Sequence, residues 1–342
     1  MSCCDETTAR VPPTDVSRRS VLKGAALVAS ALPGAAAAQG RRIKLAYCSQ
    51  LLCGVPYEVA RSAGHFKKHG LDVELVYTRG GSAAMAALVG NAVDYAATSL
   101  DVAITAFAKG AGITRFAVTG RLPLFALVTA PRTAAQIKGV GDLQGRTVGV
   151  SGLGNADHAL TLFLLANVMA DAGKVKFATM GVNLLEALRQ GQIDAGLVQE
   201  PALTLLQRAG ARVIVNAMNL ADAERYLGGA YEFMGVAVRS KEAAQRKDEM
   251  VTLTRALADA LQALRKMNGA ELIAALPKEM TTGLDTKEFG EIIVRYRDSL
   301  YPERVTIDLA AADRVAQTLV AGGLLKPGAS IKGLHDTSIV GS

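Results

Sequence analysis

A short pattern that occurs twice, one hundred residues apart, constrains the fold of this chain more than any other feature of its sequence. The first copy is GNAVDYAATSLDVAI at residues 90–104, and the second is GQIDAGLVQEPAL at residues 191–203. Asp94 and Asp194 stand at the same point of each copy, after a β-branched apolar residue and before small apolar residues. The pattern predicts one supersecondary unit used twice: a helix, a turn, and a strand that begins after the aspartate.

Alternating strand and helix signals surround both copies. Residues 42–50 and 71–77 have the apolar or alternating patterns of strands, and the helical segment between them ends at Gly70. The same order begins again at residue 146 with RTVGVSG, and from residue 241 onward amphipathic helices dominate. The sequence therefore predicts an α/β protein with two lobes, each a mixed, mainly parallel sheet flanked by helices.

The first 38 residues have the features of an export signal. The sequence SRRSVLKGAALVASALPGAAAA at residues 17–38 places Arg18 and Arg19 before a weakly apolar stretch that ends in small residues. This order resembles a twin-arginine export signal. Because the apolar stretch is short, Ala-rich and interrupted by Pro33, we do not expect a permanent membrane anchor. These features predict a protein exported to the periplasm.

The cysteines and the distribution of charge further restrict the class of protein. Cys3 and Cys4 lie in the predicted signal, which leaves Cys48 and Cys53 as one small-loop disulfide or as two buried thiols. Their five-residue separation across a strand end favours thiols, because it often fails disulfide geometry. The formal net charge is +7, but the basic residues are dispersed among acids and form no dense basic stretch with interleaved aromatics. We therefore expect no nucleic-acid partner.

The two copies of the repeated pattern end differently. In open α/β sheets, ligands bind beyond the C-terminal ends of the strands, at the place where the copies diverge. The first copy ends in TSLD at residues 98–101 and the second in VQEP at residues 198–201. We predict that Asp94 and Asp194 are structural and that the two endings determine ligand specificity.

The order of motifs resembles a known family. The segment PYEVARSAGHFKKHGLDVELVYTRGGSAAMAALVGNAVDYAATS at residues 56–99 is similar to the first lobe of type II periplasmic solute-binding proteins. The similar branch binds nitrate, taurine, aliphatic sulfonates or pyrimidine precursors of thiamine. The segment from DLQGRTVGVSGLGNADH at residue 142 to EPAL at residue 203 is similar to the second lobe of that branch. The resemblance extends over residues 42–326.

The resemblance implies a type II periplasmic binding protein fold with a cleft between its lobes. Residues 41–130 and 232–342 would form lobe one with the C-terminal helices, and residues 131–231 lobe two. It also implies a monomeric receptor, not an enzyme, that has no cofactor and closes around a small polar or anionic organic solute. A sulfonate, nitrate or an aromatic carboxylate would be captured and delivered to an ABC permease and its ATPase in the inner membrane.

Candidate ligand contacts lie in the loops after the predicted strands. Gly81 would expose backbone N–H groups at a helix start, an arrangement suited to anions, although Ser82 could be an ordinary cap. Asp101 would favour a ligand that donates hydrogen bonds, or could simply stabilise a helix start. Arg79 and Arg121 are the candidate partners of an anion. The full set of predicted contacts is Ser49, Gln50, Tyr57, Gly81, Ser82, Ser99, Asp101, Arg121, Ser151, Asn155, His158, Gln199 and Glu200.

Other chemistries have little support in the sequence. His65 and His69 have helical spacing for two metal ligands, but Lys67 and Lys68 lie between them and no acidic partner is nearby. No metal site, Ser-His-Asp order or dinucleotide-binding motif is expected, since Asp157 replaces the third glycine of such a motif. The alternatives are a binder of a thiamine-precursor pyrimidine or an enzyme of the same fold. The pyrimidine-synthesising enzymes with this fold carry a cysteine-rich motif that this sequence lacks.

Overall fold

Two five-stranded sheets organise the chain in the computed structural model, which describes residues 42–48 and 51–340. The predicted export signal, with Cys3 and Cys4, lies outside the described residues, as do Ser49 and Gln50. The first sheet has the order β2-β1-β3-β10-β4, and only β10 runs antiparallel to its neighbours. Its strands are β1 (Ile43–Cys48), β2 (Val73–Thr78), β3 (Tyr95–Ser99), β4 (Ile113–Val118) and β10 (Met234–Arg239).

The second sheet repeats this plan with the order β7-β6-β8-β5-β9. Strand β5 is antiparallel to β8 and β9, while β6 is parallel to β7 and β8. The strands are β5 (Ala126–Thr129), β6 (Thr147–Val150), β7 (Lys176–Thr179), β8 (Ala195–Val198) and β9 (Val213–Asn216). The predicted α/β fold with two mixed, mainly parallel sheets is confirmed.

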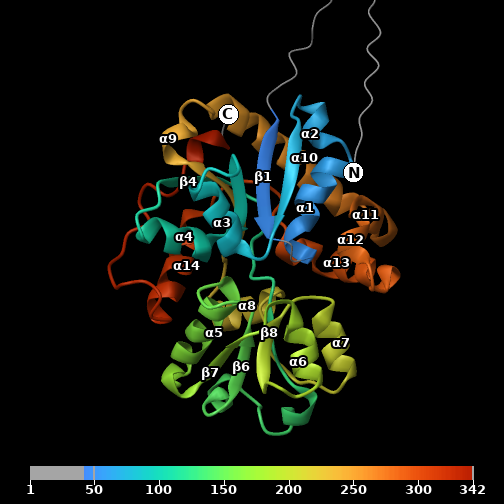
Figure 1. Cartoon of the computed structure of the whole chain (residues 1–342), viewed down its shortest axis with the longest axis vertical. Helices are drawn as coiled ribbons and strands as arrows, with labels where there is room; N and C mark the ends of the chain where they lie inside the picture. The colour runs from blue at the N-terminus through green and yellow to red at the C-terminus, as the bar shows by residue number, and fades with distance from the viewer. Residues whose placement is uncertain (1–41, 49–50, 341–342) are drawn as a thin grey trace, which may run out of the picture. The chain divides into compact units, whose positions relative to one another are not determined.

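Helices cover both sheets, and the C-terminal helices gather around the first one (Figure 1). Helix α10 packs on α1, and α14 packs on α4 and also on α5 of the second lobe. The helices before β4 are α1 (Leu51–Ser62), α2 (His65–Lys68), α3 (Gly81–Val89) and α4 (Leu100–Ala108). Those after β10 are α9 (Ser240–Ala243), α10 (Lys247–Lys266), α11 (Gly269–Ala275), α12 (Lys278–Thr281), α13 (Thr286–Leu300) and α14 (Leu309–Ala321).

The second sheet carries the helices drawn in green and yellow in Figure 1. They are α5 (Ala156–Asn167), α6 (Leu184–Arg189), α7 (Ala202–Arg208) and α8 (Leu220–Leu227). Short 3₁₀ turns complete the chain at Pro131–Thr133, Val140–Leu143, Ala172–Lys174, Gly181–Asn183 and Thr337–Ile339.

The segment PLFALVTA, residues 123–130, forms part of the second sheet and not of the first, where the sequence analysis placed it. Its strand β5 pairs with β8 and β9. An apolar run of this length identifies a buried strand but not its partner strand, since either sheet can bury it equally well. The chain therefore passes from the first sheet to the second between β4 and β5, before residue 126, and returns before β10.

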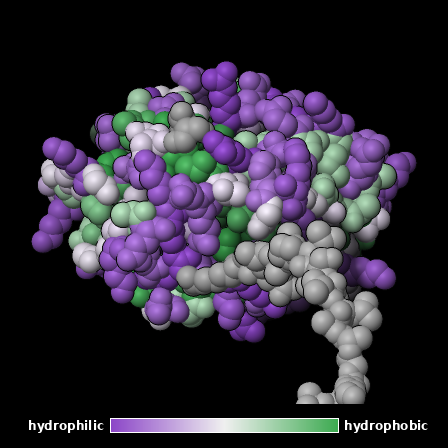
Figure 2. Space-filling model, turned by 90° about the horizontal axis from the view of Figure 1, so that it is seen from above, coloured by the Kyte–Doolittle hydropathy of each residue, from purple (hydrophilic) through white to green (hydrophobic). Residues whose placement is uncertain are grey.

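The core lies between each sheet and the helices that cover both of its faces. Every residue of β3 and β10 is buried, as expected for central strands covered on two sides. Seen from above, the surface is mainly hydrophilic, with hydrophobic residues in smaller patches between the polar ones (Figure 2). Among the described helices, none combines the length and the apolar character that a membrane span requires.

Candidate functional site

A narrow cavity lies between the two sheets and is lined by residues of both lobes. Its free space is about 320 Å³, open solvent at its mouth included. Four of the predicted ligand contacts line it: Gly81 and Ser99 from the first lobe, and Ser151 and Asn155 from the second. The other lining residues are Cys48, Cys53, Gly80, Val102, Phe125, Ala156, Phe233 and Met234.

Helix α3 begins at the cavity, and its first residue must be glycine. A Cβ on Gly81 would stand 2.4 Å from the Thr98 hydroxyl oxygen, closer than any real contact. Gly80, the residue before the helix, has a φ of 94°, which side chains rarely tolerate. The first turn of α3 has no acidic residue and no side-chain cap, so its free N–H groups remain available.

Helix α4 also begins at the cavity, directly after β3. Ser99 occupies the N-cap position and is buried, and Val102, one turn into the helix, lines the same wall. Between them lies Asp101, which is only 3% exposed; no hydrogen bond of good geometry reaches its carboxylate oxygens, although the Ser99 side chain and the Asp101 N–H lie close enough to favour the ionised form. Burial raises the pKa of Asp101 to about 6, against smaller opposing effects of Ser99 and Arg115.

Helix α5 of the second lobe begins on the opposite side of the cavity. Asp157 in its first turn accepts hydrogen bonds from the Ser151 backbone N–H, from the Ser151 hydroxyl at 3.0 Å and from the His158 N–H at 3.0 Å. Burial raises the pKa of Asp157 to about 6, although these hydrogen bonds act against the rise. The loop at the end of β6 is therefore folded around a carboxylate of the chain itself.

One hydrogen bond joins the lobes beside the cavity. The Ser82 hydroxyl donates to Asn155 Oδ1 at 2.6 Å, and the Asn155 amide donates to the Ser151 hydroxyl at 3.1 Å. Ser82 stands in the first turn of α3 and Asn155 is the N-cap of α5. Two helix starts from different lobes are thus held in contact.

Apolar and sulfur-containing side chains form the rest of the cavity wall. The rings of Phe125 and Phe233 meet edge to face, with centroids 6.0 Å apart. Cys48 and Cys53 are buried free thiols, and the Cys48 thiol raises the pKa of Cys53 through a side-chain hydrogen bond, although burial is the larger cause. Phe125 and Phe233 belong to the two segments that connect the sheets.

Sequence reasoning did not select these apolar cavity residues. It searched the loops after the strands, whereas Phe125 and Phe233 precede β5 and β10. A usable signal was present, because segments that cross between two lobes must pass beside the cleft.

Several predicted contacts point elsewhere. Tyr57 is fully buried within the first lobe, where its hydroxyl lies 2.6 Å from that of Thr119. Glu200 turns back to α7 and accepts from the Thr204 N–H at 3.0 Å and the Thr204 hydroxyl at 3.1 Å. His158 packs edge to face on Phe177, and its Nδ1 accepts from the Gly154 N–H at 3.1 Å. Gln199 does not line the cavity but lies beside the lining residue Cys53, where its side-chain hydrogen bond opposes the rise that burial causes in the pKa of that thiol.

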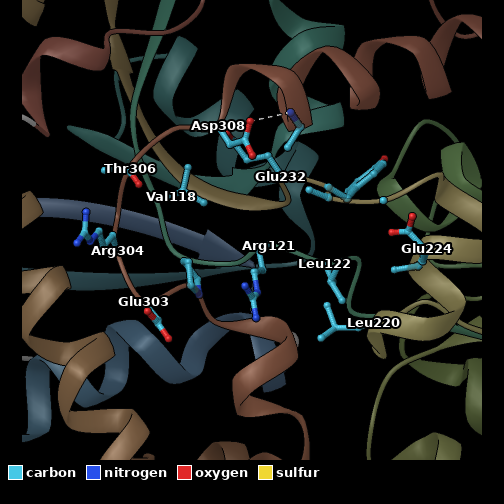
Figure 3. Close-up of a pocket in the computed structure, with 16 residues that line it drawn as sticks. Val118, Arg121, Leu122, Leu220, Glu224, Glu232, Glu303, Arg304, Thr306 and Asp308 are labelled. Atoms are coloured by element: carbon cyan, nitrogen blue, oxygen red, sulfur yellow. Dashed lines mark hydrogen bonds between the residues drawn. The ribbon is translucent and has the colours of Figure 1, made fainter.

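Arg121 lines a second, wider pocket, whose free space is about 1150 Å³ with the open solvent at its mouth included (Figure 3). Its guanidinium donates to the backbone carbonyl of Ser299 at 3.1 Å and to that of Asp298. Leu122, Glu224, Glu232 and Asp308 are among the other lining residues. Arg121 is therefore engaged outside the cavity between the sheets.

Among the described residues, no group of three or more His, Cys, Asp or Glu side chains is placed to hold a metal ion. His65 and His69 stand on α2 and at its C-cap, and His69 Nε2 lies 3.0 Å from Asp259 of α10. This contact engages His69 only, and the ring nitrogens of His65 have no hydrogen-bond partner.

The two sheets and the cavity between them define the class of the protein. The structure superposes on a protein of Bordetella bronchiseptica RB50 with a TM-score of 0.78 and 24% identity, covering 88% of this chain and 96% of that one. The periplasmic aliphatic sulphonate binding protein SsuA of Escherichia coli gives 0.64 and 22%, covering 84% and 94%. The periplasmic nitrate-binding protein NrtA of Synechocystis PCC 6803 gives 0.65 and 15%, covering 84% and 83%. The chain has the fold of the periplasmic substrate-binding proteins of ABC importers.

Residues 55–267 match the family described as NMT1/THI5 like, and the chain belongs to that family. No curated protein matches the sequence. The structural relatives are less than 25% identical, so the similarity to them concerns the fold.

Proposed function

We propose that the protein is an exported receptor that captures a small organic solute in the cavity between its lobes and delivers it to an ABC permease. The observation that carries this proposal is the cavity itself. Its walls come from both lobes, with Gly81 and Ser99 on one side and Ser151 and Asn155 on the other. A ligand that contacts both walls stabilises the closed arrangement, as expected for a receptor that closes around its ligand.

The connections between the lobes support closure as the binding motion. The chain crosses between the sheets twice, once before β5 and once before β10, and Phe125 and Phe233 lie on these crossings. Beside the cavity, Ser82 and Asn155 are joined by one hydrogen bond between exposed side chains. Such a bond contributes about 1 kcal/mol, and exposed ion pairs between the lobes, such as that of Arg208 with Glu288, contribute little, so a ligand that links the two walls can favour closure.

The proposal places the mature protein in the periplasm, exported by the twin-arginine route, as a monomer that meets a permease and its ATPase at the inner membrane. The twin arginines of the N-terminal sequence and the periplasmic relatives support this location. Lobe one would comprise residues 41–130 and 232–342, and lobe two residues 131–231. The exception is β5 (Ala126–Thr129), which belongs to the sheet of lobe two. The ligand candidates from the sequence are a sulfonate, nitrate, an aromatic carboxylate and a thiamine-precursor pyrimidine.

Native mass spectrometry of protein freshly purified from cells that export it tests the proposal. We expect a small molecule to remain bound, and its release to increase the radius of gyration measured by small-angle X-ray scattering. Phe233→Ala enlarges the cavity and should lose the bound molecule. Val182→Ala, at an exposed site in the second lobe, is the matched control and should retain it. Failure of both wild type and control to bind any small molecule from the exporting cells would contradict a receptor function.

A further inference from the structure

Four helix N-termini meet at the cavity, those of α1, α3, α4 and α5, and two of them, α4 and α5, already hold a carboxylate of the chain. A helix N-terminus attracts anions because its free N–H groups and its dipole present partial positive charge. In the second lobe, Asp157 occupies this place at α5 and accepts hydrogen bonds from Ser151 and His158. An anionic ligand in the cavity would therefore lie close to the negative charge of this buried carboxylate.

Asp101 gives α4 the same character in the first lobe. It is 3% exposed, no hydrogen bond of good geometry reaches its oxygens, the side chain of Ser99 lies beside it, and it stands between the cavity-lining residues Ser99 and Val102 in the sequence. The charged and titratable groups that act on it are Arg115, which favours its ionised form, and Asp157, which opposes it. Tyr231 is the third titratable neighbour, since the Asp101 charge raises the pKa of that phenol.

No cation compensates these two carboxylates at the cavity. Its lining residues include no lysine, arginine or histidine in the described part of the chain. Arg115 is fully buried but donates to Glu232 Oε1 at 3.1 Å and to the carbonyls of Thr98 and Phe233 at 3.2 and 2.9 Å. Oxyanion sites in proteins generally use a guanidinium or ammonium group that is free to bind the anion.

Helix α3, like α1, has no acid in its first turn. Its free N–H groups can donate to a ligand oxygen. Beside it, the Thr98 hydroxyl is fully buried and without a partner, and it lies where a Cβ on Gly81 would be. The cavity therefore combines donors at α3 with an aromatic wall from Phe125 and Phe233, and the carboxylates of α4 and α5 are buried behind its lining residues.

We propose that the cavity selects an uncharged or cationic aromatic ligand that carries both a hydrogen-bond acceptor and a donor, as in a carboxamide, and that Asp101 makes it reject oxyanions. This inference rests on the proposed receptor function and specifies its substrate class. Asp101 does not line the cavity itself. Its negative charge lies behind the part of the wall formed by Ser99 and Val102, and it affects the ligand through this wall without touching it. Sulfonates, nitrate and aromatic carboxylates are then excluded as ligands of this chain.

Three probes of the same shape and different charge test the ligand class. Benzoate, benzamide and benzamidine are titrated into the purified protein at pH 7.5 by calorimetry, with ethanesulfonate and nitrate as further anions. We expect benzamide and benzamidine to bind at least tenfold more tightly than benzoate, and the other anions not to bind. Equal affinities, a preference for any anion, or no binding of either benzamide or benzamidine would overturn the assignment.

The role of Asp101 is tested by the ratio of two dissociation constants. Asp101→Asn should reduce the preference for benzamide over benzoate by about tenfold, whereas Asp313→Asn, an exposed aspartate on α14, should leave it unchanged. Lowering the pH from 7.5 to 5.5 should reduce the preference of the wild type in the same direction, and less so in Asp101→Asn, where the contribution of Asp101 is absent and that of Asp157 remains. An unchanged ratio in Asp101→Asn would refute its role, and the wild-type pH series decides the question if that variant does not fold.

The result also separates this inference from the receptor function. If native mass spectrometry identifies a bound sulfonate, nitrate or carboxylate, the receptor function stands and the ligand class proposed here is wrong. If no bound molecule is found in wild-type protein and no probe binds, both are wrong.

Discussion

Asp94 and Asp194 bind the same backbone position of the neighbouring strand in the two lobes. The Asp94 carboxylate accepts from the Lys44 N–H of β1 at 2.8 Å, and the Asp194 carboxylate accepts from the Thr147 N–H of β6 at 2.9 Å. In return, the N–H groups of Asp94 and Asp194 donate to the carbonyls of Lys44 and Thr147 at 2.9 and 2.8 Å. The repeated sequence pattern thus encodes one structural joint, used once per sheet.

The two joints differ in their arginine partners, which predicts different costs of mutation. Arg246, with 11% of its side chain exposed, binds Asp94 at 2.8 Å, whereas Arg132, with 55% exposed, binds Asp194 at 3.0 Å. Replacing Asp94 by alanine leaves a mostly buried arginine without this partner, so we expect a loss of about 2–3 kcal/mol in the free energy of unfolding. Asp194→Ala loses the same kind of backbone hydrogen bond but an exposed ion pair, which contributes little, so it should cost about 1 kcal/mol less than Asp94→Ala.

Urea denaturation measures both values, with Asp313→Ala as an exposed control. A cost for Asp194→Ala that equals or exceeds that of Asp94→Ala would contradict the assignment of the difference to Arg246. Ligand binding by both variants should be unchanged, since neither aspartate lines the cavity.

Glu200 is predicted to stabilise α7 and not to bind the ligand. Its carboxylate accepts two hydrogen bonds from Thr204, and it is 2% exposed. Glu200→Ala should therefore lower the free energy of unfolding by about 1–2 kcal/mol, as for the loss of a helix cap. Calorimetric titration should show no change in ligand affinity. A tenfold loss of affinity at unchanged stability would restore Glu200 to the binding site.

The sequence determined much of this fold because its periodicity and turn residues agree with each other. The strands flanking Asp94 and Asp194 and the loops at Gly81, Ser99, Ser151 and Asn155 were predicted from strand ends alone. What could not be predicted depends on pairing between distant segments. The apolar run that forms β5 is equally compatible with either sheet, and only its hydrogen bonds to β8 and β9 decide between them.

The site was predicted in part for a similar reason. Loop positions after strands follow from topology, but the direction of a side chain depends on its local partners. Glu200 and His158 follow strands as expected, yet Thr204 and Gly154 bind their polar atoms. Asp101 was expected at the helix start, but that no hydrogen bond of good geometry reaches its carboxylate is visible only in three dimensions.

The ion pair between Arg115 and Glu232 is predicted to be costly to break from either side. Both side chains are almost fully buried, at 0% and 2% exposed, so burial lowers the pKa of Arg115 and raises that of Glu232. Removing one partner leaves an uncompensated buried charge, which costs about 3–5 kcal/mol. We expect this loss for Arg115→Met and for Glu232→Leu.

The double variant Arg115→Met/Glu232→Leu provides the control, because it leaves neither charge behind. Its loss in the free energy of unfolding, measured by denaturation, should be smaller than that of either single variant. A loss equal to the sum of the single variants would show that the two residues do not act as a pair.

Asp101 is predicted to lower stability at neutral pH. Its pKa and that of Asp157 are raised to about 6 in the folded protein, from ordinary values of 3.8. Between pH 4 and 6 the folded state therefore binds protons that the unfolded state has released, and the free energy of unfolding attributable to these groups falls as the pH rises. The loss is complete at about one pH unit above the folded pKa, near pH 7. Asp101→Asn removes the part of this loss that is due to Asp101, and should raise the free energy of unfolding at pH 7.5 by up to about 3 kcal/mol.

The informative quantity is the difference between Asp101→Asn and wild type at each pH. Carboxylates with a lowered pKa, such as Glu242 at about 2, change stability in the opposite direction but contribute equally to both proteins. The difference should be smallest at pH 4 and largest from about pH 7 upward, whereas Asp157→Asn should destabilise at neutral pH because it disturbs the hydrogen bonds to Ser151 and His158. A difference that does not vary with pH would show that Asp101 is ionised at no cost. A carboxylate kept at a cost in stability is expected where it serves ligand binding, since function and stability commonly oppose each other at such sites.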